Sequence, residues 1–226
     1  MTKKIFSWLG KEFMALSGEA KSGGTALEQA RNLFRSFSEE LESAGLLLDN
    51  TVRTRLWGRD RESRNLGSEE RTRALSGKAR SASSSYIAPD HFDSDASVAL
   101  DLLAMRPSRA GGEKTLKEYD PPIVPLRYLI YDSVVFLSGV TAVLPTLDNQ
   151  LADILPRISG SLADAGASWE RVVKVSFYLH RSQKPETLKA LFRKTVKAEI
   201  PQMDYSFVDG YSAEGKLIEI ETTTIR

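Results

Sequence analysis

Residues 134–139 read VVFLSG, and residues 13–18, which lie 121 positions earlier, read FMALSG. Each is a short apolar run that ends in Ser-Gly, as a buried strand does where it meets a turn. The match continues without gaps: between residues 17–57 and 138–178, nine of 41 positions are identical, including the pairs Ser17/Ser138 and Gln29/Gln150. Internal repetition of a sequence indicates repeated structural units, so we expect two similar units in this chain.

Both copies continue with the same order of predicted elements. Apolar residues at three-to-four spacing predict an amphipathic helix after each Ser-Gly, and Gly45 and Gly166 stand where a glycine commonly follows the last helical turn. Pro156 predicts a kink or a late start of the helix in the second copy. A strand is expected next in each copy, then a second helix, and finally two strands. The expected strands are residues 52–57, 83–88 and 98–105, and residues 173–178, 205–209 and 217–225; the second helices are residues 63–75, interrupted by Gly67, and a helix opened by Pro185.

This order predicts an α+β protein of two tandem domains, each a mixed β-sheet with its helices packed on one face. Residues 106–122 contain Gly-Gly, three prolines and mostly polar residues, which is typical of a linker. We therefore expect a first domain over residues 1–105, a linker over 106–122 and a second domain over 123–226.

The composition limits the function classes. The chain has 226 residues, with 31 Lys+Arg against 30 Asp+Glu and a formal net charge of +1, so no overall field favours nucleic acid or an anionic membrane, and neither partner is expected. It has no cysteine and only two histidines, His91 and His180, which excludes disulfides and an ordinary zinc site. We expect neither a metal nor a cofactor.

The N-terminal region has no secretory pattern. The apolar residues after Lys3-Lys4 are interrupted by Gly10, Lys11 and Glu12, and no apolar run approaches the roughly 20 residues that span a bilayer. A cytoplasmic location is expected.

The ordered motifs resemble those of the RidA/YjgF (reactive intermediate deaminase) superfamily, whose fold is similar to that of chorismate mutase. The second copy carries VVFLSG, then SLADAGASWERVVKVSFYL, Ile200-Pro201 and the closing LIEIETTTI; the first carries FMALSG, LESAGLLLDNTVRTRLW, Ala79-Arg80-Ser81 and ALDLLAM. The resemblance implies a homo-oligomer, usually a trimer, that binds a small carboxylate metabolite. It also implies hydrolysis of enamines or imines with release of ammonia.

The resemblance also implies a set of site residues. Arg80 matches the arginine that holds the substrate carboxylate, a role for which a planar guanidinium is suited. The corresponding position in the second copy falls near Met203. Ser17 and Ser138 match the serine of the Ser-Gly pair and are expected to bind substrate.

The acid–base residues are expected on the closing strands. The closing-strand glutamate matches Glu219 in the second copy and Asp101 in the first. Alternation in residues 217–221 places Glu219 and Glu221 on the face opposite Ile218 and Ile220. A carboxylate on a partly enclosed face is suited to general acid–base work near neutral pH.

Two alternatives remain open. Members of this superfamily usually carry a cysteine near the arginine and an asparagine on the second helix; here Ala82 stands near the first position, and Asn65 is a weak match to the second. A non-catalytic metabolite-binding or scaffold protein is therefore one alternative. The other is an enzyme similar to the chorismate hydrolases, which resemble a fusion of two such domains and act on a dicarboxylate. Arginines near residues 53–64 offer a second anion contact for that substrate.

Overall fold

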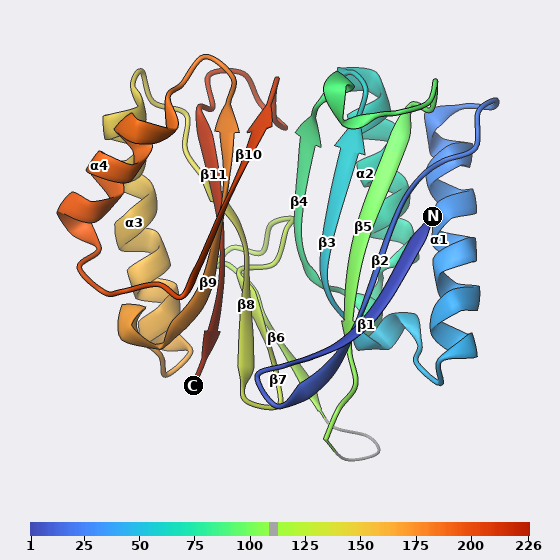
Figure 1. The fold of residues 1–226 in the computed structure, drawn as a ribbon, viewed down its shortest axis with the longest axis horizontal. Coiled ribbons are helices and arrows are strands. Elements are labelled where there is room, and N and C mark those ends of the chain that lie inside the picture. The colour runs from blue at the N-terminus through green and yellow to red at the C-terminus, as the bar shows by residue number, and fades with distance from the viewer. Residues whose placement is uncertain (109–112) are drawn as a thin grey trace. The chain divides into compact units, whose positions relative to one another are not determined.

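The computed structural model describes residues 1–108 and 113–226 and divides into two compact units, Met1–Lys114 and Thr115–Arg226. Each unit is a mixed sheet with two helices on one face (Figure 1), which confirms the predicted α+β fold class. The segment expected to be a linker, residues 106–122, contains a short strand, β6 (Lys114–Lys117), and its residues 109–112 lie outside the described part.

The first unit has the strand order β1-β2-β5-β3-β4. Only β3 and β4 run parallel; β1 with β2, β2 with β5 and β5 with β3 are antiparallel. The elements are β1 (Thr2–Trp8), β2 (Lys11–Glu19), α1 (Ala26–Ser43), β3 (Thr51–Gly58), α2 (Arg61–Ala74), β4 (Ala82–Ile87) and β5 (Val98–Met105), with 3₁₀ turns at Leu48–Asn50, Gly77–Ala79 and Pro89–His91.

The second unit repeats this topology. Its order, β10-β9-β11-β8-β7-β6, matches that of the first unit strand for strand and adds β6 at one edge; β10 and β9 are the parallel pair. The elements are β7 (Tyr128–Tyr131), β8 (Val134–Thr141), α3 (Leu147–Asp164), β9 (Val172–His180), α4 (Pro185–Thr195), β10 (Gln202–Val208) and β11 (Ile218–Ile225), with a 3₁₀ turn at Trp169–Arg171.

The first helix of each unit begins and ends at corresponding residues. Thr25 caps α1 by accepting from the backbone N–H of Glu28, and Thr146 caps α3 by accepting from that of Asn149. Gly45 and Gly166 follow the two helices with φ of +67° and +75°, a conformation that glycine adopts without strain.

Two local expectations differ from the structure. The helix α3 starts at Leu147 and runs through Pro156, so the late start does not occur. The helix α2 is continuous across Gly67. A Cβ at that position would lie only 2.9 Å from Cδ1 of Leu56. Gly67 therefore lets the helix approach the sheet closely rather than interrupting it.

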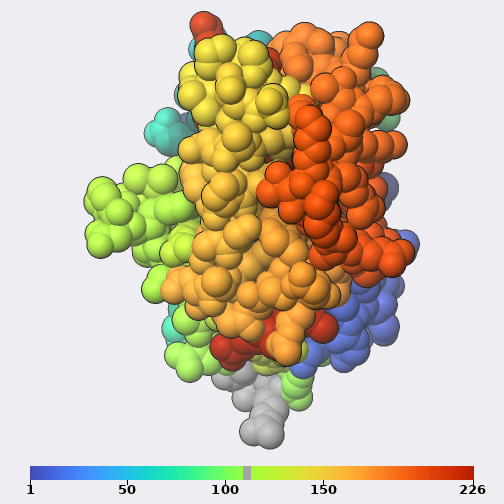
Figure 2. All heavy atoms as spheres, turned by 90° about the vertical axis from the view of Figure 1, so that its left-hand side faces the viewer, coloured from blue at the N-terminus to red at the C-terminus, as the bar shows by residue number. Residues whose placement is uncertain are grey.

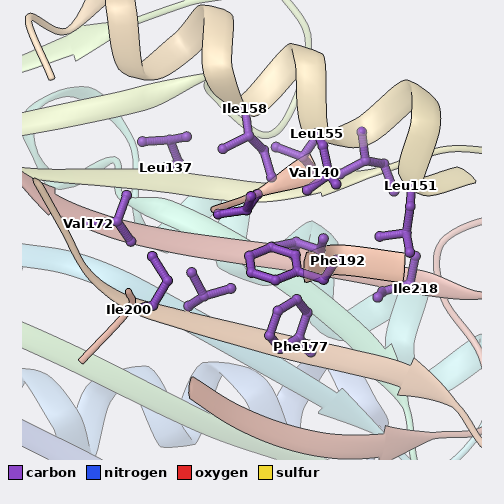
Figure 3. Packing of buried hydrophobic residues seen from close by; sticks show 14 of the residues in the cluster. Leu137, Val140, Leu151, Leu155, Ile158, Val172, Phe177, Phe192, Ile200 and Ile218 are labelled. Carbon is purple, nitrogen blue, oxygen red and sulfur yellow. The ribbon is translucent and has the colours of Figure 1, made fainter. Parts of the chain in front are cut away.

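The helices cover one face of each sheet with apolar side chains. In the second unit, Leu151, Leu155 and Ile158 of α3 pack onto the sheet, and Phe192 of α4 meets Phe177 edge to face at 5.1 Å (Figure 3). Figure 2 looks onto this helical layer, with α3 in amber and α4 in darker orange beside it. The opposite face of each sheet carries the polar residues that the sequence singled out.

Candidate functional site

The polar face of the first sheet brings Ser17, Asp101 and Arg55 into one row. Asp101 on β5 is the cross-strand partner of Ser17 on β2 and of Arg55 on β3. Its neighbours Leu100 and Leu102 belong to the core under the helices, so Asp101 points to the other face. Directly opposite residues have Cβ atoms about 4.5–5.5 Å apart, so the side chains of Ser17, Asp101 and Arg55 start side by side on this face.

Two hydrogen bonds orient the Asp101 carboxylate. The Ser17 hydroxyl donates to Oδ1 at 2.6 Å, and the Trp57 indole Nε1–H donates to Oδ2 at 2.8 Å. An ionised carboxylate has about four acceptor positions, so two remain for a water molecule or a substrate. Ser17 and Asp101, both expected as site residues, are thus in direct contact.

His91 stacks on the same tryptophan. The two rings are 4.1 Å apart between centroids and only 14° from parallel. Partial burial of the imidazole lowers the pKa of His91 below its usual 6.5, while the nearby charge of Asp101 acts in the opposite direction. The site therefore holds a neutral imidazole at neutral pH.

The loop that carries His91 is anchored on its C-terminal side. Glu19 accepts the backbone N–H groups of Asp93 and Ser94 at 2.6 and 3.0 Å, and these bonds, together with the Ser94 hydroxyl, lower the pKa of Glu19. Arg59 donates through Nε to the carbonyl of Ala96 at 2.8 Å. Because these contacts fix the loop, the position of His91 is set by the fold.

Arg80 lies at the other end of this face. It follows the 3₁₀ turn Gly77–Ala79 and stands two residues before β4. On β4, the neighbour of Arg55 is Ser84. At about 3.3 Å of rise per residue, the Arg80 backbone is therefore about 13 Å along the strand from the Asp101 row. Arg55, not Arg80, is the arginine that the register places beside Asp101.

The second unit has a related row with different chemistry. On β11, Glu221 pairs with Ser176 of β9, and the same pairing relates Glu219 to Tyr178. Since Tyr178 repeats Trp57 and Ser176 repeats Arg55, the counterpart of Asp101 is Glu221. The spacing of the motif matched Asp101 with Glu219, whereas the strand pairing matches it with Glu221, two residues further along β11.

Ser138, fully buried, lies where β8 and β11 change register between Ile220 and Thr222. The adjacent Gly139 lies under the Glu219 side chain, and a Cβ at Gly139 would overlap the Glu219 carboxylate. Glu219 and Glu221 are 6% and 2% exposed. Tyr211 is near them: its hydroxyl donates to the carbonyl of Tyr178 at 2.8 Å, and burial together with the Glu219 charge raises the pKa of Tyr211. The Ser-Gly glycine thus makes room for Glu219.

Met203, the expected counterpart of Arg80, packs on the helix side of the second sheet, where Nη2 of Arg193 lies 4.0 Å from its sulfur. It holds no carboxylate there. Among the described residues, no cluster of three or more acidic or histidine side chains has the arrangement of a metal site.

Sequence reasoning assigned no site role to Trp57, His91 or Glu221, and it named Arg55 only as one of the arginines near residues 53–64 that offer a second anion contact. For Arg55 and Glu221 the available signal was alternation with the adjacent core leucines and isoleucines. Only the indole N–H of Trp57 distinguishes this residue from a buried apolar ring. Nothing in the sequence around His91 indicates the stack on Trp57.

Comparison with known proteins supports the tandem fold. No protein-family model matches the sequence, and no curated protein does. Among solved structures, a chorismatase matches 98% of this chain and 79% of its own, with 16% identity and a TM-score of 0.65. The chain therefore has the fold of this chorismatase, with its two units in tandem. A YjgF/YER057c/UK114 family member from Mycobacterium tuberculosis covers 50% of this chain and 100% of its own, with 21% identity and a TM-score of 0.44. A Rid family protein from Yersinia pestis covers the same shares, with 17% identity and a TM-score of 0.46.

At these identities the likeness shows the fold alone, and the reaction has to be argued from the polar rows. In the described residues, no helix is long and apolar enough to span a membrane.

Proposed function

We propose that the polar face of the first unit binds a small carboxylated imine or enamine and hydrolyses it, releasing ammonia and a 2-oxo acid. The observation that carries this proposal is the row Ser17–Asp101–Arg55, in which an oriented carboxylate stands beside a guanidinium. The guanidinium pairs with the substrate carboxylate through two parallel hydrogen bonds, and the aspartate acts on water.

The reaction needs no group beyond these side chains. A water molecule that donates to Asp101 attacks the C=N carbon; the new C–O bond forms as the C=N electron pair moves onto nitrogen. Asp101 accepts one proton from water and returns it to the nitrogen, which gives a carbinolamine. The remaining hydroxyl proton then moves through water to the amino nitrogen, the C–N bond breaks, ammonia leaves, and the carbonyl of the 2-oxo acid forms. An enamine enters the same sequence after a proton from water adds to its β carbon and converts it to the imine. Ser17 keeps the Asp101 carboxylate in the plane that directs its free lone pairs outward.

In the second unit, Ser138 is expected to bind substrate and Glu219 to activate water. Glu221 joins them, since the register makes it the counterpart of Asp101. Ser176 replaces the arginine there, so the carboxylate-binding role falls to the first unit.

The substrate size separates the two arginines. In a small imino acid the carboxylate is bonded to the reacting carbon, so it must lie close to Asp101 and therefore beside Arg55. Arg80, whose backbone is about 13 Å along the strand, is suited to the far end of a longer substrate. We expect Arg55→Gln to raise KM for imino acids at least tenfold, and Arg80→Ala to have the larger effect only on a longer substrate.

A second candidate function is hydrolysis of chorismate or a similar dicarboxylate. The match to a chorismatase over 98% of this chain favours it, and a dicarboxylate would use Arg55 and Arg80 together. The two reactions release different products, ammonia from an imine and pyruvate from the enol ether of chorismate.

One experiment tests both candidates. The purified full chain is assayed for ammonia with imino acids generated in place by an amino-acid oxidase, and for pyruvate with chorismate. Asp101→Asn and Arg55→Gln are compared with wild type, and Arg157→Gln, an exposed arginine paired with Asp153 at 2.9 Å, serves as the control. Ammonia release that falls at least tenfold in both site variants supports the deaminase; pyruvate release that depends on both Arg55 and Arg80 supports the second candidate. Turnover of neither substrate favours the non-catalytic binding protein.

We also propose that the chain forms a homo-oligomer, a trimer by the family resemblance. Light scattering on the purified protein measures this directly: three times the 25.1 kDa chain mass is expected, and a monomer contradicts it.

A further inference from the structure

The first unit has a cavity away from the polar row, on the helix side of its sheet. It has a volume of about 540 Å³, within the range of small-molecule sites. It lies between the end of β2 and the first three turns of α1, and its polar lining consists of Glu19, Lys21, Gln29, Asn32, Arg35 and Ser36.

The repeat provides an internal comparison for the buried amide of this cavity. In the second unit, Gln150 uses both N–H groups, donating to the carbonyls of Leu144 at 2.8 Å and Gly215 at 2.7 Å, and its oxygen accepts from the Leu217 N–H at 2.8 Å. This amide is fully buried and its hydrogen-bonding capacity is largely used, as buried amides require.

Gln29, the repeat counterpart of Gln150, is bonded less completely although it is only 4% exposed. Its oxygen accepts from the Ser97 N–H at 2.8 Å, but its nitrogen reaches a single carbonyl, that of Gly23, at 3.5 Å. Within residues 1–108 and 113–226, the second N–H has no acceptor. Because Gln29 lines the cavity, this donor is available to an acceptor there.

The charges of the cavity indicate what it accepts. Lys21 and Arg35 line it, and neither forms an ion pair within the described part of the chain. The single anionic group is Glu19, whose oxygens already accept the N–H groups of Asp93 and Ser94. Asn32 and Ser36 add donors that stand on the same side of α1. The lining therefore presents two cations and several donors against one occupied carboxylate.

We propose that this cavity is a binding site for a small metabolite that carries an oxyanion, a phosphate or a carboxylate. Arg35 and Lys21 pair with the anionic group, and Gln29 donates its second N–H to an oxygen of the ligand. The site is separate from the Ser17–Asp101–Arg55 row and does not depend on the activity proposed for it.

The test uses the full-length protein labelled with ¹⁵N and follows the side-chain NH₂ resonances of Gln29. Three probes with a similar carbon skeleton separate the sources of charge: glucose 6-phosphate, gluconate and neutral glucose. At least one anionic probe is expected to shift the Gln29 resonances saturably below about 10 mM, whereas glucose is expected to have no effect. Which anion binds tighter distinguishes a phosphate ligand from a carboxylate ligand.

Three variants locate the site. Arg35→Gln changes an exposed residue and is expected to weaken binding at least tenfold, about 1.4 kcal/mol. Arg31→Gln is the matched control, since Arg31 lies one turn earlier on α1 and pairs with Glu70 rather than lining the cavity. Arg55→Gln is expected to leave this binding unchanged even if it abolishes turnover. Absence of a saturable Gln29 shift with both anions, or equal affinities in wild type and Arg35→Gln, overturns the proposal.

Discussion

Replacing the two repeat-related glutamines by leucine is expected to destabilise the two units unequally. Gln150→Leu removes three hydrogen bonds of 2.7–2.8 Å from a fully buried position. Gln29→Leu removes one bond of 2.8 Å and one of 3.5 Å, the second at the limit of a hydrogen bond. Leucine branches one carbon earlier than glutamine but fills a similar volume with apolar atoms, so the lost hydrogen bonds dominate both changes.

The magnitude follows from the groups left without a partner. Gln150→Leu leaves two carbonyls and the Leu217 N–H. Leu144 and Gly215 are exposed residues whose carbonyls can bind water, so each lost bond is counted at its net worth of roughly 0.5–1.5 kcal/mol, about 2–4 kcal/mol for the three. Gln29→Leu loses one bond of normal length, roughly 0.5–1.5 kcal/mol by the same rule. The second unit should therefore lose about 1–3 kcal/mol more than the first.

Each unit needs its own reporter. Unfolding in urea is followed by ¹⁹F NMR after 5-fluorotryptophan labelling, with Trp57 reporting on the first unit and Trp169 on the second. Amide hydrogen exchange gives a direct local check, because the Leu217 N–H depends on Gln150 and the Ser97 N–H on Gln29. Equal losses of stability in the two variants, or a larger loss for Gln29→Leu, would refute the reasoning and would also remove the spare donor from the proposed anion site.

Three further outcomes are expected. The Glu70 side chain is 1% exposed and accepts from Arg73 at 2.9 and 3.0 Å, and this contact is the main reason why its pKa is lowered. Glu70→Gln should lower the free energy of unfolding in urea by about 1–3 kcal/mol at pH 7. The difference from wild type should vanish as the pH falls below 4.5 through the lowered pKa of Glu70 in the folded protein. Burial and the hydrogen bond to Asp164 raise the pKa of Tyr128 to about 12, so the ultraviolet titration of Tyr128 should have a midpoint above pH 10. The stability that this raised pKa contributes should be present below pH 10 and be lost as the pH rises towards 12. A titration midpoint at pH 10 contradicts this. Protonation of His91 should quench Trp57 emission with a midpoint below 6.5, and the transition should be absent in His91→Gln.

Much of the fold follows from the sequence alone because the repeated signals are local. Three-to-four spacing and a following glycine define α1 and α3 within a few residues, and alternation defines β11. Gly67 is the exception. A glycine inside a charged segment predicted an interruption of the helix. The role of Gly67 instead depends on how closely α2 lies against Leu56 of β3.

The site is less predictable because it depends on strand order. Ser17, Arg55 and Asp101 are far apart in the chain and meet only because β5 lies between β2 and β3. Motif matching found Ser17 and Asp101, since these positions lie within recognisable runs. It offered Arg55 only as one of several arginines for a second anion contact, because Arg55 becomes a neighbour of Asp101 only through register. It chose Glu219 over Glu221, because a shift of two residues is invisible in an alternating strand.

The two units conserve their cores and their turns, but not the polar faces. The counterparts of Asp101, Arg55 and Trp57 are Glu221, Ser176 and Tyr178, so both units keep a carboxylate and an aromatic ring while only the first keeps a guanidinium beside them. A duplicated fold needs its helix-facing residues in both copies to remain stable, whereas a single carboxylate substrate needs only one bidentate partner. A chain with one carboxylate-binding row is therefore expected to have this arginine in only one of its two copies. The proposed chemistry then depends on Arg55 and not on the duplicated fold alone.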